Sequence, residues 1–139
     1  MAKIFCVANQ KGGVGKTTTT VNLAAGLSKI GQRVLMIDLD PQGNATMGSG
    51  VDKRALAYTV YDVLWGNATL DEAKVHSEAS GYDILGANRE LAGAEVELVS
   101  VENRENRLKD AIAVVANNYD FVLIDCPPSL NMLTLNGLC

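Results

Sequence analysis

The chain has 139 residues, of which 47% are apolar and 20% charged, with a formal net charge of −4. This composition fits one globular domain with a core of its own, and the sequence has no cluster of Lys and Arg with which it would bind nucleic acid by itself. There is no room for a signal peptide before the first apolar run, and no apolar stretch approaches membrane-spanning length, so we expect a cytoplasmic protein that does not enter the membrane. The three cysteines show no metal-binding spacing and are expected to be reduced thiols: Cys6, Cys126 and Cys139.

The first predicted elements are a strand, a glycine-rich loop and a helix. Residues 4–8 are short, apolar and partly β-branched, as in a buried strand. The loop KGGVGKTT follows at residues 11–18, and a helix is predicted over 17–30, with its apolar residues on the face toward a sheet: Leu23, Leu27 and Ile30. Backbone N–H groups and the positive end of the helix dipole converge at such a loop, which predicts a phosphate site.

The end of this loop has the spacing of a P-loop. In that pattern Lys16 reaches the β and γ phosphates and the Thr17 hydroxyl holds magnesium. Gln10 stands where the strict pattern has its first glycine, and Gly12 and Gly13 supply the backbone freedom instead. The alternative is a solvated glycine turn that binds nothing.

A second lysine, Lys11, gives the loop a family resemblance. The run KGGVGKTT resembles the deviant Walker A ATPases, which include the ParA partition proteins, the MinD division-site proteins and the nitrogenase iron protein. The resemblance implies that Lys11 reaches across a nucleotide-sandwich dimer to the partner's phosphates. It also implies a nucleotide-binding set: Lys11, Gly12, Gly13, Val14, Gly15, Lys16, Thr17 and Thr18.

A second buried strand is predicted over residues 33–38. Apolar strands on both sides of an alanine-rich helix indicate a mainly parallel sheet of the α/β doubly wound class. The resemblance to the deviant Walker A ATPases implies that this sheet has the P-loop NTPase architecture. The following run DLDPQGNAT, residues 38–46, resembles the ParA switch I segment. The resemblance implies that Asp40 handles the water that attacks the γ-phosphate and that Asp38 helps to organise the site. The alternative is an ordinary turn at Asp-Pro-Gln-Gly.

The middle of the chain predicts supporting elements. Two short helices are expected over 59–65 and 70–75, capped by Thr59 and Thr69, and His76 is expected to be a surface residue. A third strand is predicted over 82–86, and a helix follows from Asn88 to Leu98. A further helix over 104–117 carries an apolar stripe that is expected in the core: Leu108, Ile112, Val115 and Ala116.

Residues 121–125 form the most strand-like run and end in an acid, as in the Walker B form. A carboxylate there, at Asp125, is placed to hold Mg²⁺ directly or through water, although it is also able simply to cap the next turn. The run DCPPSL, residues 125–130, resembles the ParA switch II segment, and a helix begins at about Ser129. An iron–sulfur role for Cys126 is not expected, because no second suitably placed thiol is present.

These features predict that residues 1–139 are the N-terminal part of a single P-loop ATPase domain, truncated on the C-terminal side. The resemblance implies a ParA-type ATPase for chromosome or plasmid partition, with ATP and Mg²⁺ as ligands and an ATP-dependent homodimer. It also implies slow hydrolysis stimulated by a ParB-type partner, and non-specific binding to nucleoid DNA through residues expected beyond Cys139. The alternatives are a MinD-like membrane-positioning ATPase, a small-molecule synthetase of the same fold, and a module that keeps the fold without holding nucleotide.

Overall fold

The computed structural model describes residues 3–8, 14–39, 43–52, 56–65, 68–87 and 104–126. Their elements, in chain order, are β1 (Lys3–Ala8), α1 (Val14–Lys29), β2 (Val34–Asp38), α2 (Asn44–Gly48), α3 (Val60–Trp65), α4 (Leu70–Ala73), β3 (Val75–Ser77), β4 (Tyr82–Leu85), α6 (Arg104–Val115), a 3₁₀ turn (Ala116–Asn118) and β5 (Phe121–Cys126).

The strands form one sheet in the order β1-β5-β2-β4-β3. β5 pairs in parallel with both β1 and β2, and β2 pairs in parallel with β4. β3 alone is antiparallel, paired with β4 along the edge of the sheet. The mainly parallel sheet that the sequence predicts is therefore confirmed, with one added antiparallel strand.

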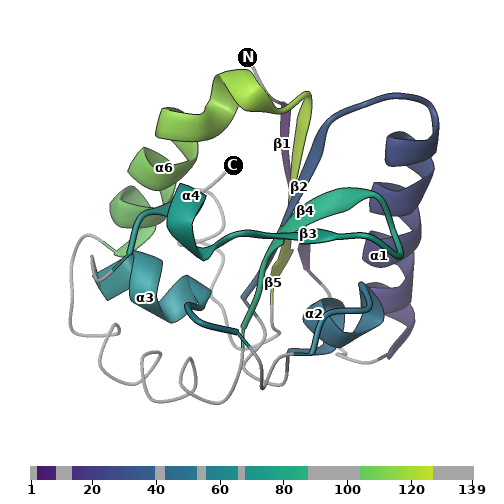
Figure 1. The fold of residues 1–139 in the computed structure, drawn as a ribbon, viewed down its shortest axis with the longest axis horizontal. Helices are drawn as coiled ribbons and strands as arrows, with labels where there is room; N and C mark the ends of the chain where they lie inside the picture. The colour runs from purple at the N-terminus through teal and green to yellow at the C-terminus, as the bar shows by residue number, and fades with distance from the viewer. Residues whose placement is uncertain are drawn as a thin grey trace.

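Helices cover both faces of this sheet (Figure 1). Alternate residues of β2 belong to different apolar clusters: Met36 joins Ala24 of α1, whereas Ile37 joins Ile112 of α6 and Val63 of α3. A strand buried on both faces is the reason that β2 reads as an unbroken apolar run. The doubly wound class is confirmed.

Helix α1 packs on the sheet through a face that only partly matches the predicted one. Leu27 packs against the apolar cluster as expected. Leu23 is 46% exposed and Ile30 71% exposed, whereas Thr20 and Ala24 are fully buried. Small side chains allow a helix to lie close to a sheet. At this contact the small residues Thr20 and Ala24 therefore face the sheet, and Leu23 points away from it. The helix also begins at Val14, earlier than expected, and ends in a Schellman motif, in which Gly31 (φ 86°) and Gln32 donate to carbonyls of the last turn.

The predicted helix over 70–75 is too long. α4 ends at Ala73, and Val75 begins strand β3, which the sequence pattern did not indicate. The predicted cap is confirmed: the Thr69 hydroxyl accepts from the N–H of Glu72 at 3.1 Å, and the Glu72 carboxylate accepts from the N–H of Thr69 at 3.0 Å. α6 ends two residues earlier than predicted, with Ile112 and Val115 buried as expected.

The predicted helices that start at Asn88 and at Ser129 lie outside the described residues. Within the part of the chain that the structure describes, no helix combines the length and apolar character needed to cross a membrane.

Candidate functional site

The carboxyl ends of β1, β5 and β2 meet at one edge of the sheet. In the register of these parallel strands, Asp125 stands opposite Val7 on one side and Asp38 on the other. α1 starts at Val14, so residues 9–13 join the end of β1 to the start of this helix at the same edge. Ligands of open α/β sheets bind outside the carboxyl ends of the strands, and this edge is therefore the candidate site.

The predicted P-loop sequence leads into α1. Gly15, Lys16 and Thr17 lie in the first turn of the helix, where the backbone N–H groups have no partner within the helix. This turn contains no acidic residue, and the last turn contains Lys29. The positive end of the helix dipole therefore lies at the candidate site without a helix carboxylate to offset it.

Two buried carboxylates lie at this edge, Asp38 at the end of β2 and Asp125 near the end of β5, and both side chains are fully buried. Side chains alternate between the two faces of a strand. Because Met36 and Leu123 lie in the apolar cluster of α1, Asp38 and Asp125, each two residues later, lie on that same face. The sequence thus folds so that both carboxylates share a face with the helix that begins with Gly-Lys-Thr.

Asp38 is engaged by helix α2. Its Oδ2 accepts hydrogen bonds from the Thr46 backbone N–H at 2.9 Å and from the Thr46 hydroxyl at 2.7 Å. The same hydroxyl accepts from the N–H of Ala87 at 3.1 Å. Thr46 did not stand out in the sequence beyond its place in the switch I resemblance, because its contact with Ala87 spans 41 residues.

The remaining predicted site residues are only partly placed. Lys11, Gly12, Gly13 and Asp40 lie outside the described residues, and for Val14, Gly15, Lys16, Thr17 and Thr18 the structure describes the backbone in α1. Among the residues described, no three His, Cys, Asp or Glu side chains are grouped so as to hold a metal ion.

A family model described as "AAA domain" matches residues 2–139. The chain belongs to the AAA domain family. Within this family it is similar to the sporulation initiation inhibitor protein Soj of Bacillus subtilis, with 51% identity over 99% of the chain and 54% of that protein. It is 48% identical to the chromosome partitioning protein ParA of Caulobacter vibrioides, over 98% of the chain and 52% of that protein. The resemblance to ParA proteins that the motifs indicate is confirmed.

A solved structure also resembles this AAA domain. It is named cobyrinic acid a,c-diamide synthase from Mycobacterium smegmatis, with bound ATP analog and magnesium. The TM-score is 0.88 and the identity 47%, over 99% of the chain and 56% of that protein. The chain spans about half the length of the curated relatives it matches.

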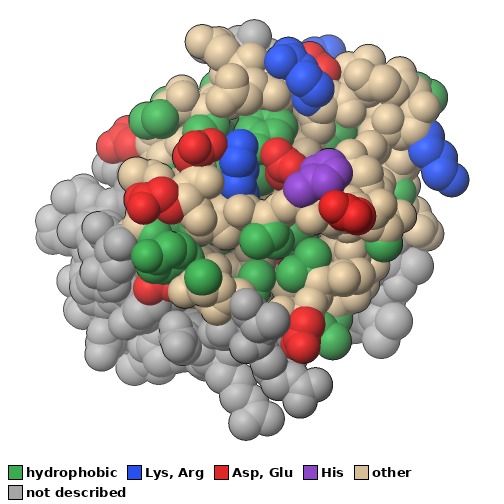
Figure 2. Space-filling view, in the orientation of Figure 1, with side chains coloured by type: hydrophobic (Ala, Val, Ile, Leu, Met, Phe, Trp, Pro, Cys, Tyr) green, Lys and Arg blue, Asp and Glu red, His purple; other side chains and the backbone are tan. Residues whose placement is uncertain are grey.

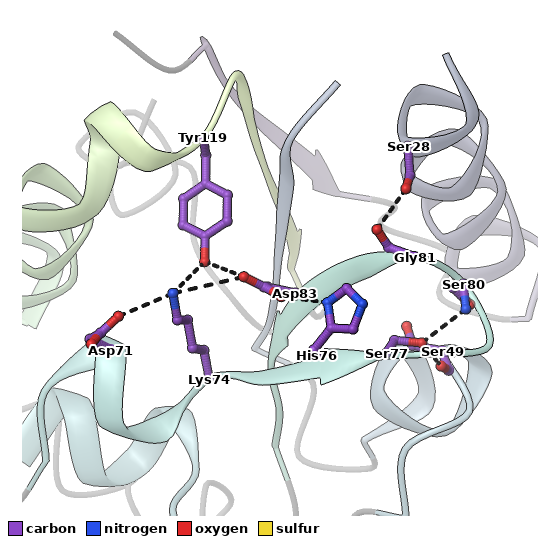
Figure 3. A network of polar contacts seen from close by, with 10 residues as sticks. All are labelled: Ser28, Ser49, Asp71, Lys74, His76, Ser77, Ser80, Gly81, Asp83 and Tyr119. Carbon is purple, nitrogen blue, oxygen red and sulfur yellow. Dashed lines mark hydrogen bonds and ion pairs between the residues drawn. The ribbon is translucent and has the colours of Figure 1, made fainter. Parts of the chain in front are cut away.

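The AAA domain has a second polar cluster, at the opposite, amino-terminal edge of the sheet (Figure 3). The Tyr119 hydroxyl donates to Asp83 at 2.6 Å and accepts from Lys74 at 3.0 Å. Lys74 also pairs with Asp71 at 3.0 Å, and His76 Nδ1 lies 2.8 Å from Asp83. The surface position predicted for His76 is confirmed at 59% side-chain exposure, but the residue lies in strand β3 and has a carboxylate partner.

The Tyr119 and Lys74 side chains of this cluster are electrostatically coupled. Burial, followed by the hydrogen bond to Asp83, raises the pKa of Tyr119 to about 12. The hydrogen bond with Tyr119 is the main cause that raises the pKa of Lys74. In Figure 2, basic side chains and the single histidine lie among acidic ones over this part of the surface. The cluster joins α4, β3, β4 and the residue that follows the 3₁₀ turn before β5, which gives it a structural role away from the candidate site.

Proposed function

We propose that residues 1–139 form the N-terminal, nucleotide-binding part of a single P-loop ATPase domain of the ParA type, which binds ATP with Mg²⁺ and hydrolyses the γ-phosphate. The observation that carries this proposal is that α1, which has Gly15-Lys16-Thr17 in its first turn, packs on the face of the sheet where Asp38 ends β2 and Asp125 lies near the end of β5. The similar structure with bound ATP analog and magnesium supports it, at 47% identity.

Each residue of the site has a proposed role. The backbone N–H groups of the loop, with Gly12, Gly13 and Gly15 in it, surround the phosphates, and Lys16 neutralises their charge. Thr17 and Asp125 supply the hard oxygen atoms that Mg²⁺ prefers, and the buried position of Asp125 at this edge fits such a ligand. When bound, the ion offsets the negative charge that gathers on the phosphate oxygens. Asp40 orients the attacking water.

The biological role that we propose is chromosome or plasmid partition in the cytoplasm. The names of the relatives, a chromosome partitioning protein and Soj, support this role. In this proposal, ATP closes a homodimer in which Lys11 contacts the phosphates of the partner subunit, and the dimer binds nucleoid DNA. A ParB-type partner then stimulates hydrolysis and release. In this proposal, the residues that bind DNA lie beyond Cys139.

The nucleotide site is tested by titration calorimetry of the native protein with Mg²⁺ and ATP. Lys16→Ala is expected to weaken ATP binding by at least about tenfold, because a charge-assisted contact to phosphate is worth about 1.5–3 kcal/mol. Lys29→Ala, at the other end of the same helix, is the matched control and is expected to bind as the wild type does. Unchanged binding by Lys16→Ala would refute the P-loop assignment.

Hydrolysis is tested separately with Asp40→Ala. This variant is expected to bind ATP normally and to turn it over more slowly, because it lacks the carboxylate that orients the water. An unchanged turnover rate rules out that role.

A second candidate, a synthetase that activates a small carboxylated substrate, is favoured by one observation: the similar solved structure carries the name of a cobyrinic acid diamide synthase. The two candidates differ in what stimulates turnover. A partition ATPase is accelerated by DNA and a ParB-type protein, whereas a synthetase hydrolyses ATP only in step with its small-molecule substrate. The DPQGNAT sequence that follows Asp38-Leu39 favours the partition ATPase.

A further inference from the structure

Thr46 connects three elements at the carboxyl edge of the sheet. It lies in α2 and is fully buried, its N–H and hydroxyl both donate to Asp38 at the end of β2, and its hydroxyl accepts from Ala87, just beyond the end of β4. A hydroxyl has one proton to donate, and this one is given to a carboxylate, which makes the bond charge-assisted. The hydrogen bonds of Thr46 therefore hold α2 to the ends of two neighbouring strands, β2 and β4.

The Asp38 carboxylate is the anchor for the start of α2. The N-cap residue of this helix is Gly43, at φ 67°, which has no side chain with which to cap the helix. Asp38 instead accepts the N–H of Thr46 in the first turn, so the helix is held to the sheet by the same carboxylate that its threonine binds. Breaking this contact would leave a buried charge short of a donor.

The other end of α2 is held as well. Ser49 Oγ lies 2.5 Å from the Tyr82 hydroxyl of β4. The Ser49 carbonyl accepts from the Ser77 hydroxyl of β3 (Figure 3), so both strands contact this end of α2. Along its length, α2 also lies against α1, where Gly48 faces Val21. α2 is thus held at both ends and along its length, so the residues before it connect to a helix whose position is fixed by these contacts.

In the sequence, the segment that carries Asp40 falls between two points that the structure does describe, Leu39 and Thr46. At its start, the N–H of Leu39 donates to the carbonyl of Asp125 at 2.9 Å. At its end, Thr46 is bound to Asp38, the residue that stands beside Asp125 in the sheet. Both ends are therefore tied to the pair of strands that carry the buried carboxylates.

We propose that Thr46 is a positioning residue for hydrolysis: through Asp38 and Ala87, its hydroxyl fixes the point at which the Asp40 segment rejoins the fold. The inference rests on the proposed ATPase function, and it adds a residue that contacts neither the nucleotide nor the metal in that proposal. Misplacing a reacting group by about 1 Å costs on the order of 10²-fold in rate, so the effect belongs to turnover and not to binding.

The test compares three variants of the native protein by kcat and by the Kd of a non-hydrolysable ATP analogue with Mg²⁺. Thr46→Val keeps the shape and removes the hydroxyl, Thr46→Ser keeps the hydroxyl, and Thr69→Val removes a capping hydroxyl from α4, away from this edge. We expect Thr46→Val to lower kcat by about 10- to 100-fold and leave the Kd within about threefold. Thr46→Ser and Thr69→Val should keep kcat within about threefold of the wild type, although Thr69→Val lowers the melting temperature.

Results that overturn the role of Thr46 differ from a result that removes the proposed function. A wild-type kcat in Thr46→Val, or a loss in Thr46→Ser as large as in Thr46→Val, overturns the inference. If Thr46→Val does not fold, Thr46→Ala replaces it, because alanine has the higher helix propensity and the same kcat loss is expected; if neither variant folds, Thr46 is structural and the inference fails. A wild-type protein that does not hydrolyse ATP instead removes the proposed function, and the inference with it.

Discussion

The ionisation of Tyr119 is linked to the stability of the fold. Its pKa of about 12 lies above the ordinary value of 10.0, so the folded chain holds this proton more tightly than the unfolded chain does. By linkage, the resulting stability is fully present below about pH 10 and is lost as the pH rises through about 12. The raised pKa of Lys74 acts in the same direction, because its largest cause is the hydrogen bond with Tyr119.

Tyr119→Phe is therefore expected to reduce the free energy of unfolding by about 1–2 kcal/mol near neutral pH, since it removes hydrogen bonds to Asp83 and Lys74. The difference between wild type and variant should narrow above pH 10. Urea unfolding at a series of pH values measures both effects. The control is Tyr58→Phe, at a tyrosine that is 39% exposed, for which a change within about 0.5 kcal/mol is expected. A difference that stays constant up to pH 12 contradicts the assignment.

At the scale of elements, two glycines differ in the space available for a Cβ atom. A Cβ on Gly86, after β4, would lie 2.7 Å from Cδ1 of Leu56 and 3.1 Å from Cγ2 of Thr46. Gly86→Ala is therefore expected to destabilise the fold by about 1–3 kcal/mol through overpacking. A Cβ on Gly26, within α1, would meet nothing within 4 Å, so Gly26→Ala is expected to stabilise by about 0.5–1 kcal/mol. Thermal and urea unfolding of both variants give the comparison, and equal signs for the two would contradict it.

The same scale shows what the sequence was able to predict. The sequence predicts strands β1, β2, β4 and β5 because buried strands are mainly apolar runs. The chemistry of a P-loop is also local in sequence, but the phosphate site stays a prediction, because residues 9–13 lie outside the described part of the chain. The predicted inward face of α1 is right for Leu27, which packs against the core cluster, and wrong for Leu23 and Ile30, which are exposed. The smaller side chains of Thr20 and Ala24 take the fully buried positions against the sheet. β3 was missed because its three residues obtain their strand conformation from pairing with β4.

The candidate site shows the same division. Asp38 and Asp125 stand out in the sequence as acids at the ends of apolar runs, and the register places them side by side. The contact from Thr46 to Ala87 was not predictable, because it spans 41 residues and depends on how α2 packs at the end of β4. Local motifs thus predict the carboxylates at the candidate site, whereas the residues that hold them in place depend on tertiary packing.

At the scale of the whole molecule, charge bears on the proposed homodimer. The chain has a net charge of −4, and in the proposed function each bound nucleotide would add further negative charge at the carboxyl edge. Two copies that meet across their nucleotides therefore repel one another unless cations lie in the interface. Lys11 is the residue that we propose for this role, since Lys16 is assigned to the phosphates of its own subunit.

Lys11→Ala in the native protein is accordingly expected to bind ATP with an affinity within about threefold of the wild type and to raise the Kd of ATP-dependent dimerisation by at least about tenfold, or 1.4 kcal/mol. Light scattering with Mg²⁺ and ATP measures the dimer, and calorimetry measures the nucleotide. Lys3→Ala is the matched control, because Lys3 is an exposed lysine at the start of β1, at the opposite edge of the sheet. Because the repulsion is electrostatic, the defect of Lys11→Ala should also shrink as salt is added. Dimerisation equal to that of the wild type at low salt would show that this lysine does not act across the interface.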